Sequence, residues 1–116
     1  MFEVRDAQSG LKGGTGMALM EIAVLPIGTG STSVGDFVAG MQRLLKEEGL
    51  ASQLTDMGTI VEGEVETLFA VAKRLHESVF ALGAKRAYTV IKIDDRRDRT
   101  VHLGDKTRSV QERLGA

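Results

Sequence analysis

The stretch Val24–Phe37, VLPIGTGSTSVGDF, predicts a strand, a tight loop and the start of a helix. The apolar run ends at Ile27 and Gly28, small residues follow, and an amphipathic run begins at Val34. Ser33 is in position to cap this helix, with Asp36 three residues later as in a shortened capping box. Backbone N–H groups at a helix start can bind negative or electron-rich groups, so the loop is a candidate ligand site.

The same loop does not match the known phosphate-binding motifs. No Lys follows the glycines, as a P-loop requires, and Val34 stands where a dinucleotide motif would place its third glycine. The alternative interpretation is that glycine and serine serve only to make the turn tight.

The composition indicates one ordinary globular domain. The chain has 116 residues, of which 42% are hydrophobic and 27% charged, the usage of a domain with its own core. A net charge of -1 gives no strong field to attract nucleic acid or an anionic membrane, so we expect neither partner. The chain has no Cys, which excludes disulfides and thiolate metal sites and suits the cytoplasm, where we expect the protein. No apolar run reaches transmembrane length, and residues 1–10 lack the hydrophobic segment of a signal peptide.

Residues 1–16 differ from the rest of the chain. They show no hydrophobic periodicity and end in a glycine-rich run, residues 13–16. We interpret them as a disordered leader or a segment foreign to the domain, which then comprises residues 17–116. The alternative is an added edge strand from Phe2 to Val4.

Four strands and two long helices can be located from hydrophobic spacing. Residues 19–27 form a strand that is apolar on both faces apart from Glu21, which is typical of a covered strand. A helix then runs from Val34 to Gly49, and residues 50–55 and 59–62 form a hairpin. Gly83 ends the second helix, whose apolar stripe comprises Val65, Leu68, Phe69, Ala72, Leu75, Val79 and Phe80. Residues 85–95 form the last strand, and Asp105 is in position to cap a short C-terminal helix.

The order of these elements defines the fold class. It is βαββαβ with a tail helix, so we expect an α+β ferredoxin-like sandwich. Its four-stranded antiparallel sheet carries two helices on one face, plus a short C-terminal helix.

The other face of this sheet is uncovered and yet apolar. On the last strand Ala87, Thr89, Ile91 and Ile93 share one face and Tyr88, Val90 and Lys92 the other. A large apolar patch usually marks an interface, so we predict a homo-oligomer that buries the open face.

Polar residues on this open face are informative. Glu21 and Lys92 are expected to be neighbours, because the first and last strands pair in this fold, and Asp94 shares a face with Lys92. They form either an ion pair at the rim of an interface or the lining of a polar pocket between subunits.

No catalytic constellation is present in the sequence. The chain has no Asn for an acylphosphatase-like site, and the two central strands carry no aromatic residues on which RNA bases could stack. His76 and His102 have no nucleophile or metal-ligand pattern beside them. The run DDRRDR, residues 94–99, is either a phosphate-binding patch or a solvated loop. We therefore expect no enzyme activity, no cofactor and no metal site.

Three motifs together give a specific resemblance. VLPIGTGSTSVGDF, TDMGTIVEGE and IKIDDRRD, in this order and spacing, resemble the thiamine-binding protein family, whose members have a ferredoxin-like fold. The resemblance covers about residues 19–114. The sequence departs from the family at Asp56, where a proline is expected before Met57, and this substitution puts the turn that presents Met57 in doubt.

The resemblance implies a homotetramer, a dimer of dimers in which two protomers extend one sheet and two such sheets stack. It also implies non-catalytic binding of thiamine or its aminopyrimidine (hydroxymethylpyrimidine) half at subunit contacts. The matching ligand-binding positions are Thr29, Gly30, Ser31, Thr32, Met57, Gly58, Thr59, Lys92 and Asp94, and Glu62 is added as a carboxylate that could face the cationic thiazolium.

Two other functions remain open at this level. The protein could be an enzyme or regulatory subunit that binds a phosphorylated small molecule, with the loop before the first helix and Arg96, Arg97 and Arg99 holding the anion. It could also be a structural tetramer whose ligand site has decayed.

Overall fold

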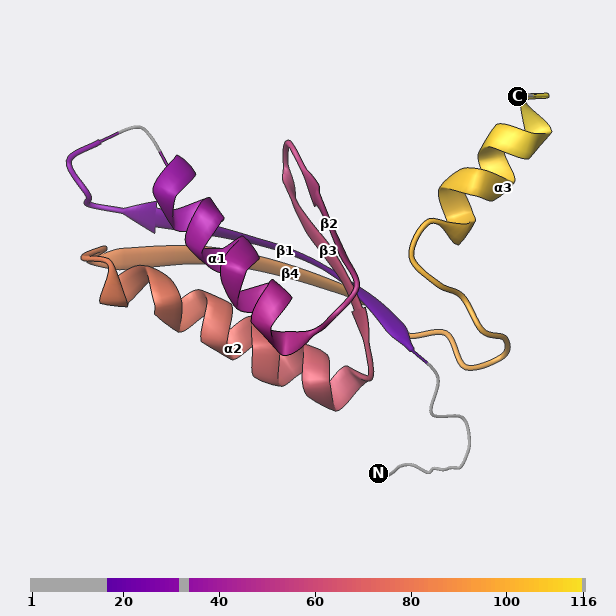
Figure 1. Ribbon diagram of the computed structural model, residues 1–116, viewed down its shortest axis with the longest axis horizontal. Helices are drawn as coiled ribbons and strands as arrows, with labels where there is room; N and C mark the ends of the chain where they lie inside the picture. Colours follow the sequence, from indigo (N-terminus) through magenta and orange to yellow (C-terminus); the bar gives the residue numbers. More distant parts are fainter. Residues whose placement is uncertain (1–16, 32–33, 116) are drawn as a thin grey trace.

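The computed structural model describes residues 17–31 and 34–115 of the chain. The elements, drawn in Figure 1, are β1 (Ala18–Ile27), α1 (Gly35–Glu48), β2 (Ser52–Thr55), β3 (Gly58–Gly63), α2 (Val65–Ala81), β4 (Arg86–Asp94) and α3 (Asp105–Arg113). The predicted leader, 1–16, lies outside the described residues, as do Thr32 and Ser33.

The four strands form one antiparallel sheet in the order β2-β3-β1-β4. The long strand β1 therefore lies at the centre, with β3 on one side and β4 on the other. Together with the element order this is a small α+β, ferredoxin-like fold, and the predicted fold class is confirmed.

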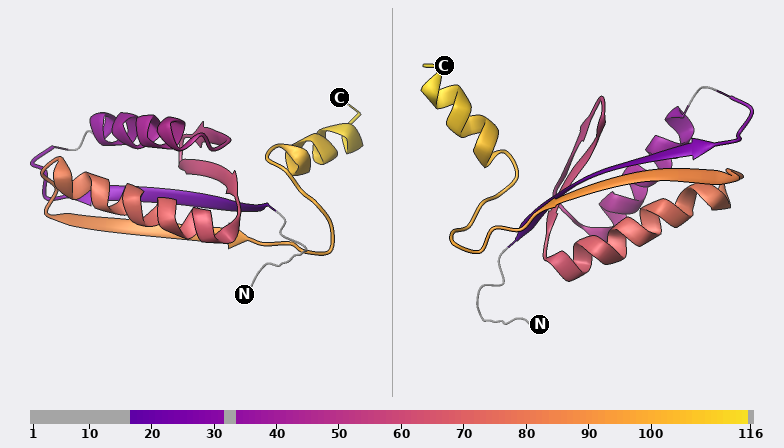
Figure 2. Two further views of the ribbon diagram at one scale, coloured as in Figure 1. Left: turned by 60° about the horizontal axis from the view of Figure 1, so that its bottom comes forward. Right: turned by 180° about the vertical axis from the view of Figure 1, so that it is seen from behind.

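Both long helices cover the same face of the sheet (Figures 1 and 2). Strand β1 alternates strictly, so that every second side chain enters the layer between sheet and helices. The core there is built from Ala18, Met20, Ile22 and Val24 of β1, Val61 of β3, Met41 and Leu45 of α1, and Leu68, Val71, Ala72, Leu75 and Val79 of α2. No third layer covers the other face within the described part of the chain, so β1 exposes apolar side chains there.

The helix ends differ from the sequence predictions. Helix α1 begins one residue later than expected, with Val34 at the N-cap and no side-chain cap, so Asp36 is not placed to complete a capping box. Gly49 does end this helix in the left-handed conformation, with φ 73°. At α3 the N-cap is Gly104 and not Asp105, whose carboxylate instead accepts a hydrogen bond from the His102 backbone N–H, just upstream of the helix.

Two members of the predicted apolar stripe on α2 are not part of the core. Phe69 is 57% exposed and Phe80 is also exposed, whereas Leu68 is fully buried. The predicted stripe is wider than the buried surface of α2, because only one side of this helix can face the sheet and α1 at once. Phe80 makes an edge-to-face contact with His76, which also hydrogen-bonds Thr89 Oγ1 through Nδ1 at 2.7 Å.

Among the described residues, none of the helices combines the length and the apolar character that crossing a membrane would require.

Adjacent positions on α2 give a matched test of this packing. Leu68→Ala should lower the free energy of unfolding by about 2–5 kcal/mol, because it empties a fully buried site. Phe69→Ala should change it by less than about 1 kcal/mol, because the ring is already largely in solvent. Denaturant unfolding at one protein concentration measures both. Equal losses would contradict the assigned face of α2.

Candidate functional site

The open face of the sheet has two unlike ends. One end, which we call the polar end, carries charged side chains: Glu21 of β1, Glu62 of β3, and Lys92 and Asp94 of β4. The strand register brings them together, since Leu19 pairs with both Glu62 and Asp94, and Glu21 pairs with Lys92. At the other end Leu25 and Ile27 of β1 and Tyr88 and Val90 of β4 form an exposed apolar patch.

The centre of the polar end is an ion pair between neighbouring strands. Lys92 Nζ lies 2.9 Å from Glu21 Oε1, which confirms the predicted contact between these two residues. Both side chains are substantially exposed, so the pair adds only about 0–1 kcal/mol to stability. Its chemical importance is therefore the placement of one positive and one negative group on the open face.

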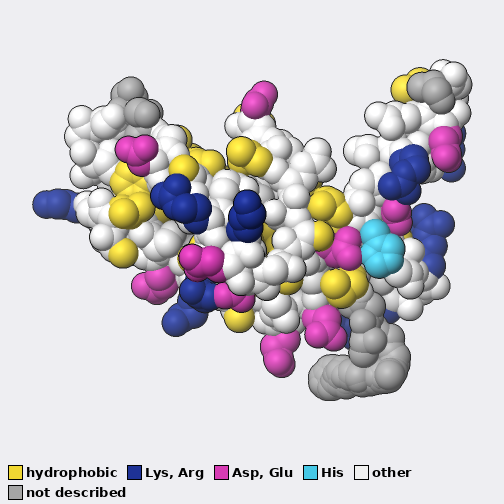
Figure 3. Space-filling view, in the orientation of Figure 1, with side chains coloured by type: hydrophobic (Ala, Val, Ile, Leu, Met, Phe, Trp, Pro, Cys, Tyr) yellow, Lys and Arg dark blue, Asp and Glu magenta, His cyan; other side chains and the backbone are white. Residues whose placement is uncertain are grey.

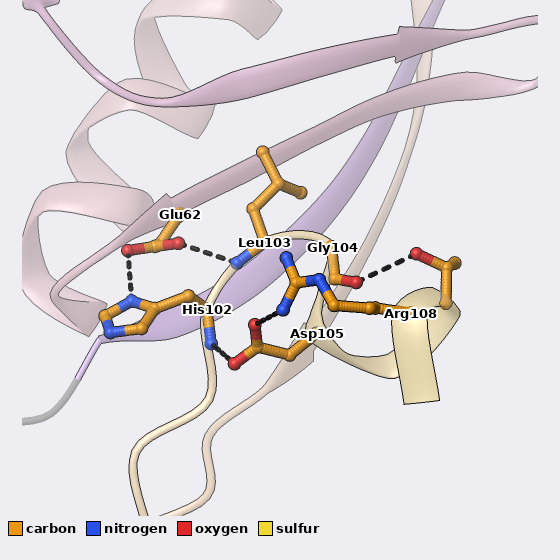
Figure 4. Close-up of polar contacts among 7 residues, drawn as sticks. Glu62, His102, Leu103, Gly104, Asp105 and Arg108 are labelled. Atoms are coloured by element: carbon orange, nitrogen blue, oxygen red, sulfur yellow. Dashed lines mark hydrogen bonds and ion pairs between the residues drawn. The ribbon is translucent and has the colours of Figure 1, made fainter. Parts of the chain in front are cut away.

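Glu62 is held at this end by two contacts, one to each of its carboxylate oxygens (Figure 4). One oxygen accepts a hydrogen bond from the backbone N–H of Leu103 at 2.7 Å, and the other lies 2.9 Å from His102 Nδ1. Asp105 accepts the His102 backbone N–H at 2.8 Å and pairs with Arg108 at 3.0 Å. These contacts attach the segment after β4 to strand β3.

A second contact attaches the same segment to β4. We call residues 95–115 the C-terminal arm; its Lys106 forms an ion pair with Asp94. The arm reaches beyond the end of the sheet and carries α3 away from α1 and α2 (Figures 1 and 2). In the space-filling view an open notch separates it from the rest of the molecule (Figure 3).

The contacts around Glu62 and His102 shift the pKa values of the groups involved. The Leu103 N–H and the neighbouring imidazole lower the pKa of Glu62 below its ordinary value of 4.5. The hydrogen bond to Glu62 raises the pKa of His102 above its ordinary value of 6.5. The hydrogen bond from the His102 backbone and the Arg108 guanidinium lower the pKa of Asp105. The ionised forms of all three groups are thus favoured together.

The predicted loop site lies at the opposite end of the sheet. Gly28 and Gly30 adopt positive φ, 82° and 79°, and turn the chain sharply after β1. Thr29 Oγ1 donates to the Ser31 carbonyl at 3.1 Å and accepts from the Ser31 N–H at 3.3 Å, so this hydroxyl closes its own loop. Thr32 lies outside the described residues.

The turn between β2 and β3 presents a third set of candidates. Met57 is 84% exposed at its tip, and Gly58 approaches the β1 backbone so closely that a Cβ there would lie 3.1 Å from the Ile22 carbonyl oxygen. Thr55 Oγ1 donates to the Gly58 carbonyl at 2.8 Å and accepts the Met57 N–H, which closes the turn with Asp56 in place.

Thr59 points away from the open face. It is only 7% exposed, and its Oγ1 accepts a hydrogen bond from Gln42 Nε2 of α1 at 3.0 Å. Its hydroxyl therefore serves the contact between β3 and α1, and only its backbone is near the turn.

The predicted site residues that the structure describes, all but Thr32, thus do not form one pocket within a single chain. Glu62, Lys92 and Asp94 come together, whereas Thr29, Gly30 and Ser31 lie about 26 Å away along β1, at about 3.3 Å a residue. The arginines predicted to hold an anion together with this loop are Arg96, Arg97 and Arg99. They follow β4 at the polar end and are equally distant from the loop.

A hollow of about 560 Å³ lies in the arm, beside Arg99, Arg108 and Arg113.

The structure adds residues that sequence reasoning did not place at the site. His102, Leu103 and Lys106 contact Glu62 and Asp94. The contact between Glu62 and His102 joins residues 40 positions apart in the sequence, and no local sequence pattern predicts it. Within residues 17–31 and 34–115, no group of three or more His, Cys, Asp or Glu side chains is arranged to hold a metal ion.

These features define a small ferredoxin-like protein with an uncovered sheet face, polar at one end and apolar at the other. Residues 20–111 match the family model described as thiamine-binding protein. The chain is 42% identical over 102 residues to the UPF0045 protein YqgV of Bacillus subtilis, covering 84% of this chain and 98% of that protein. This chain belongs to the thiamine-binding protein family.

Solved structures share the fold. The hypothetical protein MJ1052 of Methanocaldococcus jannaschii superposes with a TM-score of 0.75 at 25% identity, covering 83% of this chain and 97% of that one. A Thermotoga maritima protein, described as a candidate thiamine biosynthesis/salvage protein, has the same fold, with a TM-score of 0.70 at 19% identity and coverage of 81% and 98%.

The His102–Glu62 contact should make attachment of the arm dependent on pH. Because the pKa of His102 is raised on folding, its contribution is complete below its ordinary value of 6.5 and is lost as pH rises through the folded value. Because the pKa of Glu62 is lowered, its contribution is complete above 4.5 and is lost as pH falls through the folded value. The attachment is therefore strongest between pH 4.5 and 6.5.

An NMR titration of the His102 ring measures this directly. Its midpoint should lie above 6.5 and fall in Glu62→Gln, which removes the negative partner. His76 is an internal control, because Glu62→Gln leaves its contacts with Thr89 and Phe80 intact. An unchanged His102 midpoint in the variant would show that the two side chains do not interact in solution.

Proposed function

We propose that this protein binds thiamine or its aminopyrimidine (hydroxymethylpyrimidine) half as a homo-oligomer, without catalysing a reaction. The observation that carries the proposal is the family match over residues 20–111, which spans every element that forms the open face. The proposal includes a cytoplasmic location, which a chain without Cys suits.

The groups on the open face suit the chemistry of such a ligand. Thiamine joins a cationic thiazolium to a flat aminopyrimidine with an amino donor and ring-nitrogen acceptors. Glu62 and Asp94 supply negative charge, and Lys92 supplies a donor beside them. Met57 supplies a soft, exposed apolar surface that can cover a ring.

The uncovered face supports the oligomer. Leu25, Ile27, Tyr88 and Val90 expose a contiguous apolar area on two paired strands, and such areas usually mark an interface. The nine-residue strand β4 also has no neighbour on one side within the described chain, so a second protomer can extend the sheet there. Stacked faces and extended sheets together give a dimer of dimers.

Stacking also unites the divided site. When two open faces meet with their strands antiparallel, the loop of one chain, Thr29 to Ser31, lies over the polar end of the other. Thr32 belongs to the same loop in the sequence. A ligand at this contact meets the loop backbone from one protomer and Glu62, Lys92 and Asp94 from its partner.

A phosphorylated ligand is the second candidate. The specific observation in its favour is the hollow beside Arg99, Arg108 and Arg113, whose guanidinium groups are suited to phosphate. This hollow lies in the arm, far from the loop before α1, so an anion site would use the arm alone.

Ligand-induced stabilisation separates these functions. Thiamine or hydroxymethylpyrimidine at about a hundred times its dissociation constant should stabilise the protein by roughly 2.7 kcal/mol, measured as a rise in unfolding temperature. Plain phosphate should have no effect on the proposed site. A rise with phosphate and thiamine phosphate alone would favour the second candidate.

Two alanine variants locate the binding site. Lys92→Ala and Asp94→Ala should weaken binding while both proteins stay folded, because these side chains are exposed. Lys73→Ala is the matched control, since Lys73 is an exposed cation on α2, which lies on the covered side of the sheet. Unchanged affinity in the first two variants would remove them from the site.

The oligomer can be tested independently of any ligand. Leu25→Arg places a charge in the apolar patch and should shift the protein toward smaller species in light scattering at micromolar concentration. Leu54→Arg is a control of similar exposure on β2, where Leu54 lies on the opposite face from Leu25. A wild-type protein that is monomeric would refute the interface itself.

A further inference from the structure

Helix α3 is not packed into the core formed by residues 17–31 and 34–115. None of its residues is buried, and Val110 is 54% exposed. Leu114, just beyond the helix, is 78% exposed and lies one turn from Val110, so the two form one apolar side. A nine-residue helix without packing is marginal in water, so something must cover this side for α3 to be stable.

We propose that α3 is a clasp that packs its Val110–Leu114 side against the apolar patch of a second copy of this chain. The proposal rests on the oligomer proposed above and specifies which element of each copy meets the other. The second copy is the occupant because its open face supplies the exposed Leu25, Ile27, Tyr88 and Val90.

The attachment of the arm sets the side on which α3 emerges. Glu62 and Asp94 belong to the open face by register, and they hold His102, Leu103 and Lys106. The arm is therefore anchored on the uncovered side of the sheet, where a stacked partner would lie. Gly104, with φ 92°, then redirects the chain into α3.

The two ends of the open face are complementary in a stacked pair. Antiparallel stacking brings the polar end of one copy, with its arm, over the apolar end of the other. The arm extends past the end of its own sheet (Figure 1), so in such a pair α3 would reach the partner's apolar end and not its own. The symmetry axis repeats the contact, so each dimer contains two clasps.

Charge favours the same arrangement. The arm carries more cationic than acidic side chains, with Arg96, Arg97, Arg99, Lys106, Arg108 and Arg113 against Asp95, Asp98, Asp105 and Glu112. Residues 17–94 carry more acidic than cationic ones. Transfer of the arm to a second copy therefore brings groups of opposite net charge together.

Cysteine cross-linking tests the contact directly, because the chain has no Cys of its own. Full-length Val110→Cys and Leu25→Cys proteins are mixed and treated with a thiol oxidant. A disulfide between the two different chains, identified by peptide mass, is the expected product. Gln111→Cys, the next position on α3, is the matched control and should cross-link at least several-fold less.

The same helix position tests the energetics. Val110→Asp should raise the dissociation constant of the oligomer about tenfold or more, a change of about 1.4 kcal/mol that is comparable to burying one valine. Gln111→Asp makes an equivalent change on the neighbouring position and should have a smaller effect.

The outcomes distinguish this proposal from the proposed function. An oligomer that binds thiamine but shows neither the Val110 cross-link nor weaker association in Val110→Asp would overturn the clasp alone. A cross-linked pair that binds no thiamine would leave the clasp in place and refute the ligand. A monomeric wild-type protein would overturn the clasp together with the oligomer.

Discussion

The pairing of β1 with β4 is the constraint on which the rest of the structure depends. Nine residue pairs, from Leu19 opposite Asp94 to Ile27 opposite Arg86, fix the register over almost the full length of both strands. Because side chains alternate across a strand, shifting the pairing register by one residue would move the core side chains of β1 to the solvent-exposed face. The buried set Ala18, Met20, Ile22 and Val24 therefore also determines what appears on the open face.

The register explains how one small domain carries two kinds of surface. The same alternation that fills the core places Glu21 beside Lys92 near one end of β1 and Leu25 beside Tyr88 near the other. Neither surface is needed for the core, since both lie on the face away from the helices. The family description points to a small-molecule ligand, whereas the core accounts only for the fold.

Much of the fold could be predicted from the sequence, because periodicity reports local structure. The alternation of residues 19–27 and the glycine at 49 were sufficient for a strand and a helix end. The Glu21–Lys92 contact also followed, since it needs only the strand order of the fold and the alternation of side chains. The exposure of Phe69 did not follow, because a helical stripe does not show how wide a surface the sheet can cover.

The candidate site was less predictable. The contact between Glu62 and His102 depends on the path of the chain after β4, and hydrophobic periodicity does not predict the path of a charged loop. The position of Thr59 was equally hidden, because its hydroxyl has a partner on α1 that only the packed structure reveals. The resemblance identifies the three motifs, but it does not show that the first motif lies far from the third in the folded chain.

The two-sided apolar character of β1 has a consequence for synthesis of the protein. Strand β1 leaves the ribosome before either neighbour, and β4 begins 59 residues after Ile27, a delay of roughly 3–12 s at bacterial elongation rates. Until β3 follows, beginning 31 residues after Ile27, this strand is unpaired on both edges, and its β4 edge stays open for the whole delay, a condition that favours aggregation of nascent chains. Glu21 is the single charge within this strand, and it acts as a gatekeeper until Lys92 has been made.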